Sequence, residues 1–141
     1  MADILYHNVF LEMITKTMNF GAAGDVFNLA LFTSSKVIEV DDTAYSTVNE
    51  CPETGNYVHG GFAFTPANQS VTDVDADNWT IFDINEDAAW ATATITARYA
   101  QLYDATVANK LVCCFDFGAD KSSTVGTFKV VFNASGVIKL A

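Results

Sequence analysis

The chain of 141 residues is half hydrophobic and 17% charged, which excludes an intrinsically disordered protein and suits one domain over residues 1–141. Its net charge of −10 repels phosphate groups, so we expect neither a nucleic-acid partner nor an anionic membrane partner. No stretch approaches the roughly 20 apolar residues of a membrane-spanning helix. The first residues also lack the basic and apolar regions of a secretory signal.

The first predicted element is an amphipathic helix near residues 5–18. Apolar pairs recur about one turn apart, and an acidic residue precedes a basic one by four positions, as on a helix surface. Two glycines then stop the helix. The residues that carry this prediction are Val9-Phe10, Met13-Ile14, Thr17-Met18, Glu12, Lys16, Gly21 and Gly24.

After the helix, hydrophobic residues alternate with a period of two, which indicates strands. A buried strand is predicted over Val26–Phe32, then a polar loop over residues 39–61 with a short helical turn near 43–48. The pattern predicts a mainly β fold, an antiparallel, jelly-roll-like β-sandwich with one N-terminal amphipathic helix. The later predicted strands are Phe62–Thr65, Val71–Asp75, Trp79–Ile84, Thr92–Tyr103, Leu111–Phe117, Thr127–Phe132 and Val137–Leu140.

The three cysteines, Cys51, Cys113 and Cys114, form a poor disulfide framework because their number is odd and two are adjacent. Adjacent residues on a strand point to opposite faces, so Cys113 and Cys114 cannot bind one metal together. We expect reduced, partly buried thiols in a protein made in a cytosol.

Near the C-terminus, Asp116-Phe117-Gly118 matches the magnesium-binding triplet of protein kinases. The sequence lacks the glycine-rich loop, the strand lysine and the catalytic loop that a kinase requires. We therefore interpret the triplet as the end of a strand. Phe115 and Phe117 then share one face, Cys114 and Asp116 share the other, and Gly118 opens a turn.

Arg98 is the only arginine and lies in the middle of a predicted strand. A guanidinium in that position requires a carboxylate partner. We predict a structural ion pair between Arg98 and Asp116 on a neighbouring strand. The alternative is that Arg98 binds a carboxylate of a partner molecule.

An acidic stretch begins like a calcium-binding EF-hand loop, but Asn78 and Ile84 stand where that pattern requires Gly and Glu. Two interpretations remain open: a loose calcium site, or an acidic strand edge that deters aggregation. The carboxylates concerned are Asp73, Asp75, Asp77 and Asp83.

The sequence contains no recognisable catalytic constellation. No cysteine or histidine lies at zinc-ligand spacing from His7 or His59. A Gly-x-Ser-x-Gly nucleophile motif is also missing. We therefore predict a protein that is not an enzyme and uses neither a metal nor a cofactor.

Several motifs resemble those of a family of small virion proteins of tailed bacteriophages, along essentially the whole chain. They are turns and strand patterns rather than catalytic signatures. In the second half the motifs are Ile81–Trp90, Thr94–Tyr99, Leu102–Asp104, Asp116–Asp120, Ser122-Ser123, Gly126–Phe128 and Asn133–Gly136. In the first half they are Leu31–Ser35, Tyr45, Asn49-Glu50, Tyr57 and Gly60-Gly61.

The resemblance implies a capsid cement or decoration protein. Such a protein would bind across neighbouring subunits of the major capsid protein, as a dimer or trimer, on the virion surface after synthesis in the bacterial cytoplasm. The chain departs from the family pattern after Ser35, where the apolar Val37-Ile38 and Val40 suggest a surface for a partner.

Two alternatives remain open. One is a structural protein of the tail, neck or host-attachment fibre. The other is a sugar- or calcium-binding β-sandwich module in which exposed Trp79, Trp90 or Tyr57 would stack on a ligand.

Overall fold

The computed structural model describes residues 3–76 and 79–140. Strands dominate this part of the chain and α1 is its single α-helix, which confirms the predicted mainly β fold with one N-terminal helix. In chain order the elements are β1 (Ile4–Leu5), α1 (His7–Ile14), β2 (Phe27–Phe32), β3 (Phe62–Ala63), the short 3-10 helix η1 (Pro66–Asn68), β4 (Gln69–Val74), β5 (Trp79–Ile84), β6 (Ala88–Ala93), β7 (Thr96–Asp104), β8 (Lys110–Ser122), β9 (Gly126–Val130) and β10 (Ile138–Leu140).

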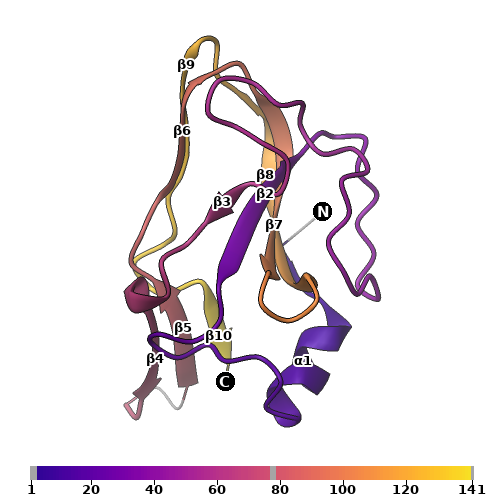
Figure 1. Cartoon of the computed structure of the whole chain (residues 1–141). Helices are drawn as coiled ribbons and strands as arrows, with labels where there is room; N and C mark the ends of the chain where they lie inside the picture. Colours follow the sequence, from indigo (N-terminus) through magenta and orange to yellow (C-terminus); the bar gives the residue numbers. More distant parts are fainter. Residues whose placement is uncertain (1–2, 77–78, 141) are drawn as a thin grey trace.

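The strands form an antiparallel β-sandwich of two layers (Figure 1). One layer is a five-stranded sheet in the order β1-β8-β7-β2-β3. The other contains the three-stranded sheet β10-β5-β4 and the two-stranded sheet β6-β9. These two small sheets follow one another along the second layer, because β5 leads into β6 and β9 leads into β10.

The main hydrophobic core lies between the two layers. Leu29 and Leu31 of β2 meet Trp90 of β6 and Phe128 of β9 in one cluster of buried side chains. Aromatic rings fill much of this space; Phe27, for example, stacks on Phe20 with 5.0 Å between the ring centroids. The large aromatic content of the chain is therefore used inside the sandwich.

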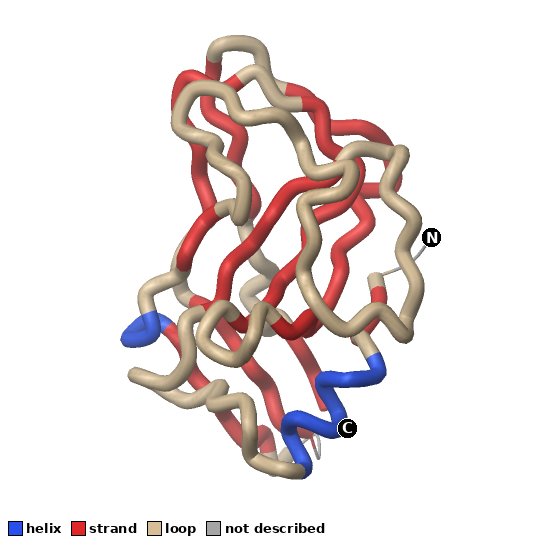
Figure 2. The backbone as a smooth tube through the Cα atoms, turned by 45° about the vertical axis from the view of Figure 1, so that its right-hand side comes forward, coloured by secondary structure: helices blue, strands red, loops and turns tan. Residues whose placement is uncertain are grey.

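The five-stranded sheet is covered on its other face as well. Ala30 and Phe32 of β2 point there and pack with Tyr6, which precedes α1, and with Ile38 from the long loop after β2. Figure 2 shows this loop and α1 on the same side of the sheet. A strand buried on both faces has no polar face, which explains why β2 is apolar at every position except the half-buried Asn28.

The helix is shorter than predicted, and it buries only part of its predicted apolar pairs. It ends at Ile14, because Lys16 adopts a left-handed backbone with φ of 58°. Val9 and Glu12 are buried, whereas the apolar Phe10, Leu11 and Ile14 are exposed. Glu12 binds Lys110 Nζ at 3.0 Å, so the Glu12–Lys16 spacing that helped to predict the helix does not mark a helical ion pair.

The predicted long strand Thr92–Tyr103 is wrong as a single element. The chain bends near the end of β6 at Thr92, whose φ is 52°, and crosses to the other layer between Ala93, the last residue of β6, and Thr96, the first residue of β7. Ile95 exchanges two backbone hydrogen bonds with Ser123 at the crossing, at 3.2 and 2.9 Å. The β-branched composition continues through the crossing, so the sequence gives no sign of the break.

The loop between β2 and β3 contains no helical turn near residues 43–48, contrary to the prediction. Ala44 instead forms an isolated antiparallel bridge with Lys110 at the start of β8. Gly61 closes the loop with φ of 78°, and a Cβ atom at this position would collide with the Leu29 carbonyl of β2. Among the described residues, no helix is both long and apolar enough to span a membrane.

Candidate functional site

Arg98 and Asp116 lie side by side on β7 and β8. Arg98 Nε donates to Asp116 Oδ1 at 2.6 Å, and Nη2 donates to Oδ2 at 3.2 Å. This two-pronged geometry is the strongest form of an arginine–carboxylate contact. The guanidinium, together with the Gly118 amide at 2.8 Å, holds the pKa of the Asp116 carboxyl well below its ordinary value.

The ion pair lies at an irregular point of the β7–β8 ladder. Ala97 pairs with Lys121 and Tyr99 pairs with Asp116, so β8 contains extra residues opposite Arg98. Gly118 within this bulge has φ of 76°, a backbone that glycine adopts without strain. The Asp-Phe-Gly triplet therefore lies inside a bulged strand that continues to Ser122, so the prediction that it ends the strand and that Gly118 opens a turn is wrong. Its carboxylate accepts hydrogen bonds from the Arg98 guanidinium and the Gly118 amide.

The faces predicted for this strand are confirmed. Cys113, Phe115 and Phe117 pack toward the core between the layers, and Cys114 packs in the cluster on the other face. All three cysteines are buried, and none of them forms a disulfide bond. Burial raises the pKa of the Cys51 and Cys114 thiols to about 12 and also raises that of Cys113, so the thiols stay protonated and unreactive at neutral pH.

The acidic stretch begins on β4, where the Thr80 hydroxyl donates a hydrogen bond to Asp73. Asp77, which the calcium hypothesis also requires, lies outside the described residues. Within residues 3–76 and 79–140, no three His, Cys, Asp or Glu side chains are grouped so that they could hold a metal ion. His59 lies 3.8 Å from Glu53 Oε1 in an exposed pair.

Two of the three aromatic residues proposed to stack on a sugar are buried. Tyr57 is 0% and Trp90 is 2% exposed, and their rings meet edge to face at 5.3 Å. Trp79 is half-buried, and Lys139 Nζ lies 3.4 Å from its ring centroid. These three side chains therefore offer no open aromatic platform for a ligand.

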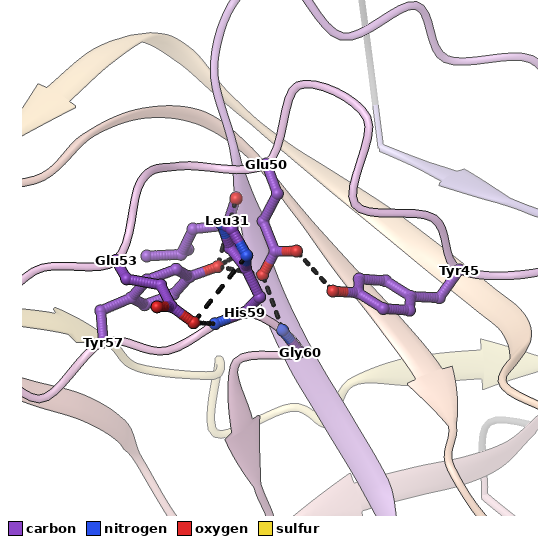
Figure 3. A network of polar contacts seen from close by, with 7 residues as sticks. All are labelled: Leu31, Tyr45, Glu50, Glu53, Tyr57, His59 and Gly60. Atoms are coloured by element: carbon purple, nitrogen blue, oxygen red, sulfur yellow. Dashed lines mark hydrogen bonds and ion pairs between the residues drawn. The ribbon is translucent and has the colours of Figure 1, made fainter.

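The long loop after β2 is fastened by one buried carboxylate, that of Glu50 (Figure 3). Glu50 Oε1 accepts hydrogen bonds from the Tyr57 hydroxyl at 2.7 Å and from the Gly60 amide at 2.8 Å. Glu50 Oε2 accepts a hydrogen bond from the Tyr45 hydroxyl. One side chain therefore ties together three separate parts of the loop.

The same network attaches the loop to the sheet. The Tyr57 hydroxyl accepts a hydrogen bond from Leu31 N at 2.9 Å, and Tyr45 stacks on Tyr103 of β7 with 4.4 Å between ring centroids. Burial, followed by the contact with Glu50, raises the pKa of Tyr45, and burial is the main cause of the raised pKa of Tyr57. Both phenols therefore remain protonated donors, as a carboxylate acceptor requires.

Asp104 at the end of β7 is another buried carboxyl group. Its Oδ1 accepts from the amides of Thr106 at 2.9 Å and Val107 at 3.0 Å. Its Oδ2 faces the Asp25 carboxyl and finds no hydrogen-bond donor in the described part of the chain while both groups are ionised. Burial, and then the contact with Asp25, raises the pKa of Asp104 to about 7.

The exposed side of α1 carries a compact apolar surface. Leu11 is 60% and Ile14 is 81% exposed, and Phe10 beside them is 44% exposed. Ile14 lies three residues after Leu11 and four after Phe10, so its side chain is next to both on one side of the helix. The His7 amide at the start of this face donates to Val40 O at 2.8 Å, which places the half-exposed Val40 of the long loop beside it.

We call Phe10, Leu11, Ile14 and Val40 the helix face. The sequence suggested a partner surface at Val37-Ile38 and Val40, and the structure divides this group. Val37 and Val40 are exposed, whereas Ile38 is buried beneath them in the cluster on the five-stranded sheet. A helix that buries Glu12 and exposes three large apolar side chains is suited to a second contact surface.

Sequence reasoning missed the network around Glu50 and the orientation of α1. A glutamate in an irregular loop belongs to no periodic pattern, so its burial had no signal beyond the tyrosines five and seven residues away. The two faces of α1 both contain apolar residues, and periodicity alone does not decide which face is buried.

Comparison with protein families, with curated proteins and with solved structures found no match to this chain.

Proposed function

We propose that the chain is a non-enzymatic structural protein of a tailed-bacteriophage virion, and specifically a capsid decoration protein. It would bind across neighbouring major capsid protein subunits as a homo-oligomer and stabilise the shell. The observation that carries a binding role is the helix face, because large apolar side chains exposed together on one helix mark an interaction site.

The chemistry of the described residues supports binding rather than catalysis. Two of the buried carboxylates already have partners within the chain: Glu50 fastens a loop and Asp116 binds Arg98. A net charge of −10 keeps such a protein soluble before assembly and apart from the packaged DNA. The resemblance of its sequence motifs to small phage virion proteins suggests the capsid as the place where the chain binds.

Quantitative mass spectrometry of purified particles of the encoding phage tests the assignment. A copy number that scales with that of the major capsid protein supports a decoration protein. A small number set by the symmetry of the tail or neck would move the protein to that part of the particle. Absence from particles would overturn the virion assignment altogether.

Two variants test whether the helix face makes the contact. Leu11→Asp combined with Ile14→Asp should leave the chain folded but remove it from particles, because two charges would be buried in the interface. The matched control is Val71→Asp, which places a charge on a half-exposed valine of β4. Equal incorporation of both variants would exclude the helix face as the contact.

A further inference from the structure

One edge of the sandwich is hollowed along its length. Three hollows of about 510, 310 and 190 Å³ lie between β8 and β1 in one layer and β9 and β10 in the other. The hollow of 510 Å³ lies along β9 and shares Phe117, Val130 and Val131 with the middle hollow of 310 Å³; we call it the upper hollow. The middle hollow shares Asp3, Phe115 and Val137 with the hollow of 190 Å³ beside β1 and β10, which we call the lower hollow. The three hollows therefore form one continuous channel, which we call the edge groove.

Both walls of the edge groove are strand edges. Strand β9 pairs with β6 on one side, and no strand of the described chain pairs with its other edge. Strand β8 pairs with β7, and β1 covers its outer edge only at Cys113 and Cys114. Such edges present unpaired amide and carbonyl groups to any extended backbone that reaches them.

The chain already uses the lower end of the groove in this way. Ile4 and Leu5 of β1 pair antiparallel with Cys114 and Cys113, and Tyr6 N continues the contact by donating to Val112 O at 3.1 Å. A two-residue strand is stable there only because it adds to an existing sheet. The upper end of the groove, along β9, has the same open edge and no such strand among the described residues.

The upper groove is apolar at its base and basic at its rim. Half-buried Phe117 and Val130 supply apolar surface, and Lys121 and Lys129 line the same hollow. The segment 121–132 contains no Asp or Glu, although the chain has 17 acidic residues against seven basic ones. Lys139 lines the lower hollow. Lys129 Nζ also lies 2.7 Å from Asp87 Oδ2 in an exposed ion pair. The middle hollow is lined by Asp3 and by Asp116, which binds Arg98. The basic part of the groove is therefore the upper hollow, where the exposed Lys129–Asp87 pair is weak enough for a partner's carboxylates to contact Lys121 and Lys129.

We propose that the edge groove binds an extended segment of a partner protein, alternately apolar and acidic, by β-strand addition to the free edge of β9. Its backbone pairs with β9, its apolar side chains pack on Phe117 and Val130, and its carboxylates contact Lys121 and Lys129. This is the recognition mode in which main-chain hydrogen bonds supply affinity and alternate side chains supply specificity.

The inference rests on the proposed function only for the identity of the partner, which would be an extended arm of a capsid subunit. The helix face and the edge groove lie on different elements, so one molecule could contact two neighbouring subunits, as a cementing protein must. The chemistry of the groove does not depend on that identity.

The binding test uses a fluorescein-labelled eight-residue peptide of alternating valine and glutamate, and a second peptide in which lysine replaces glutamate. Fluorescence anisotropy with the purified chain should show binding of the acidic peptide and at least tenfold weaker binding of the basic one. Lys121→Glu combined with Lys129→Glu should reverse this preference. The matched control, Lys16→Glu combined with Lys36→Glu, changes the net charge equally outside the groove and should retain it.

Backbone pairing is tested separately with two N-methylated forms of the acidic peptide. Methylation of alternate amides on one edge should abolish binding, and methylation of the amides on the other edge should leave it unchanged, since a strand adds through one edge. Equal effects of the two forms, or failure of the acidic peptide to bind, would overturn strand addition.

Hydrogen exchange locates the bound peptide. Bound acidic peptide should slow exchange of amides in Gly126–Val130. Slow exchange of these amides in the free protein, at high but not low protein concentration, would show that a second copy occupies the edge and would overturn the proposal. None of these measurements involves virus particles, so absence of the chain from virions would overturn the proposed function without affecting this result.

Discussion

The long loop after β2 and the strand edges at the edge groove differ in how their polar groups are satisfied. On one side an irregular loop of the chain is closed tightly over the sheet, with Glu50 satisfying a backbone amide and two phenols. At the edge of the sandwich, regular strands β8 and β9 leave a groove open. Regular secondary structure therefore does not indicate which polar groups find hydrogen-bond partners within the chain. The irregular loop has its partners within the chain, whereas no described strand pairs with the outer edge of β9.

The largest effect expected on the closed side follows from removing its carboxylate. Glu50→Ala leaves two buried phenols and the Gly60 amide without an acceptor, and we expect a loss of about 4 kcal/mol in unfolding free energy. Glu50→Gln keeps the shape and most hydrogen bonds, because the Tyr45 hydroxyl can turn to accept from the amide, and should cost about 1 kcal/mol. Urea unfolding measures both, and losses close to zero for both variants would show that the Glu50 carboxylate does not fasten the loop.

A second prediction concerns the buried carboxyl that lacks a donor. The pKa of Asp104 is raised from 3.8 to about 7 in the folded chain, so the folded state binds the proton more tightly than the unfolded state. Stability from this proton is complete below the unfolded pKa and is lost as pH rises through the folded pKa. Between pH 5 and 8 we expect a loss of about 3 kcal/mol from this group.

Asp104→Asn removes this titration and keeps the acceptor for the Thr106 and Val107 amides. Its amide also donates to Asp25 without a proton from solvent. The variant should therefore gain stability relative to the parent chain at pH 8 but not at pH 5, measured by urea unfolding. Exposed Asp41→Asn is the control; a parallel pH dependence for the parent and Asp104→Asn would contradict the assignment.

At the open edge, the ion pair in the β8 bulge is the feature expected to matter most. Arg98→Ala leaves the Asp116 carboxylate, whose side chain is 1% exposed, without its guanidinium, and should lower the Tm of the chain. Arg98→Lys restores the charge without the two-pronged geometry and should recover part of the loss. If Arg98→Ala has no effect on thermal unfolding, the alternative that Arg98 serves a partner's carboxylate becomes the better explanation.

The smallest expected effect is on the unfolding free energy of variants on the exposed face of α1, compared with a variant on its buried face. Leu11→Gln and Ile14→Gln alter exposed side chains and should each change the unfolding free energy by less than about 0.5 kcal/mol. Val9→Ala on the buried face should cost about 2 kcal/mol. Comparable losses at Leu11 and Val9 would mean that the helix face packs inside the protein.

Strands that are buried on one face or on both faces could be predicted, because burial imposes alternation with a period of two or a run of mostly apolar residues. Trp79–Ile84 is β5, and Val26–Phe32 contains all of β2. The crossing at Thr92–Ile95 could not be predicted, because β-branched residues suit both strands that it joins. The boundary of α1 was set by a left-handed Lys16, which leaves no compositional trace.

The Arg98–Asp116 contact was accessible to sequence reasoning because a sole arginine within a strand of an acidic chain requires a carboxylate. The Glu50 network was not accessible, since its donors come from a loop in which no periodicity relates Tyr45, Tyr57 and Gly60. The edge groove depends on which strands remain unpaired. Strand order is a property of the whole fold rather than of any one segment.

Residue-resolved hydrogen exchange of the free protein tests the contrast between closed loop and open edge most directly. The amides of Cys51 and Gly60, bound to Leu31 O and Glu50 Oε1, should exchange slowly although they lie in a loop. Alternate amides of Gly126–Val130, on the outer edge of β9, should exchange rapidly although they lie in a strand. Rapid exchange at Cys51 and Gly60 together with uniform protection along β9 would contradict the account.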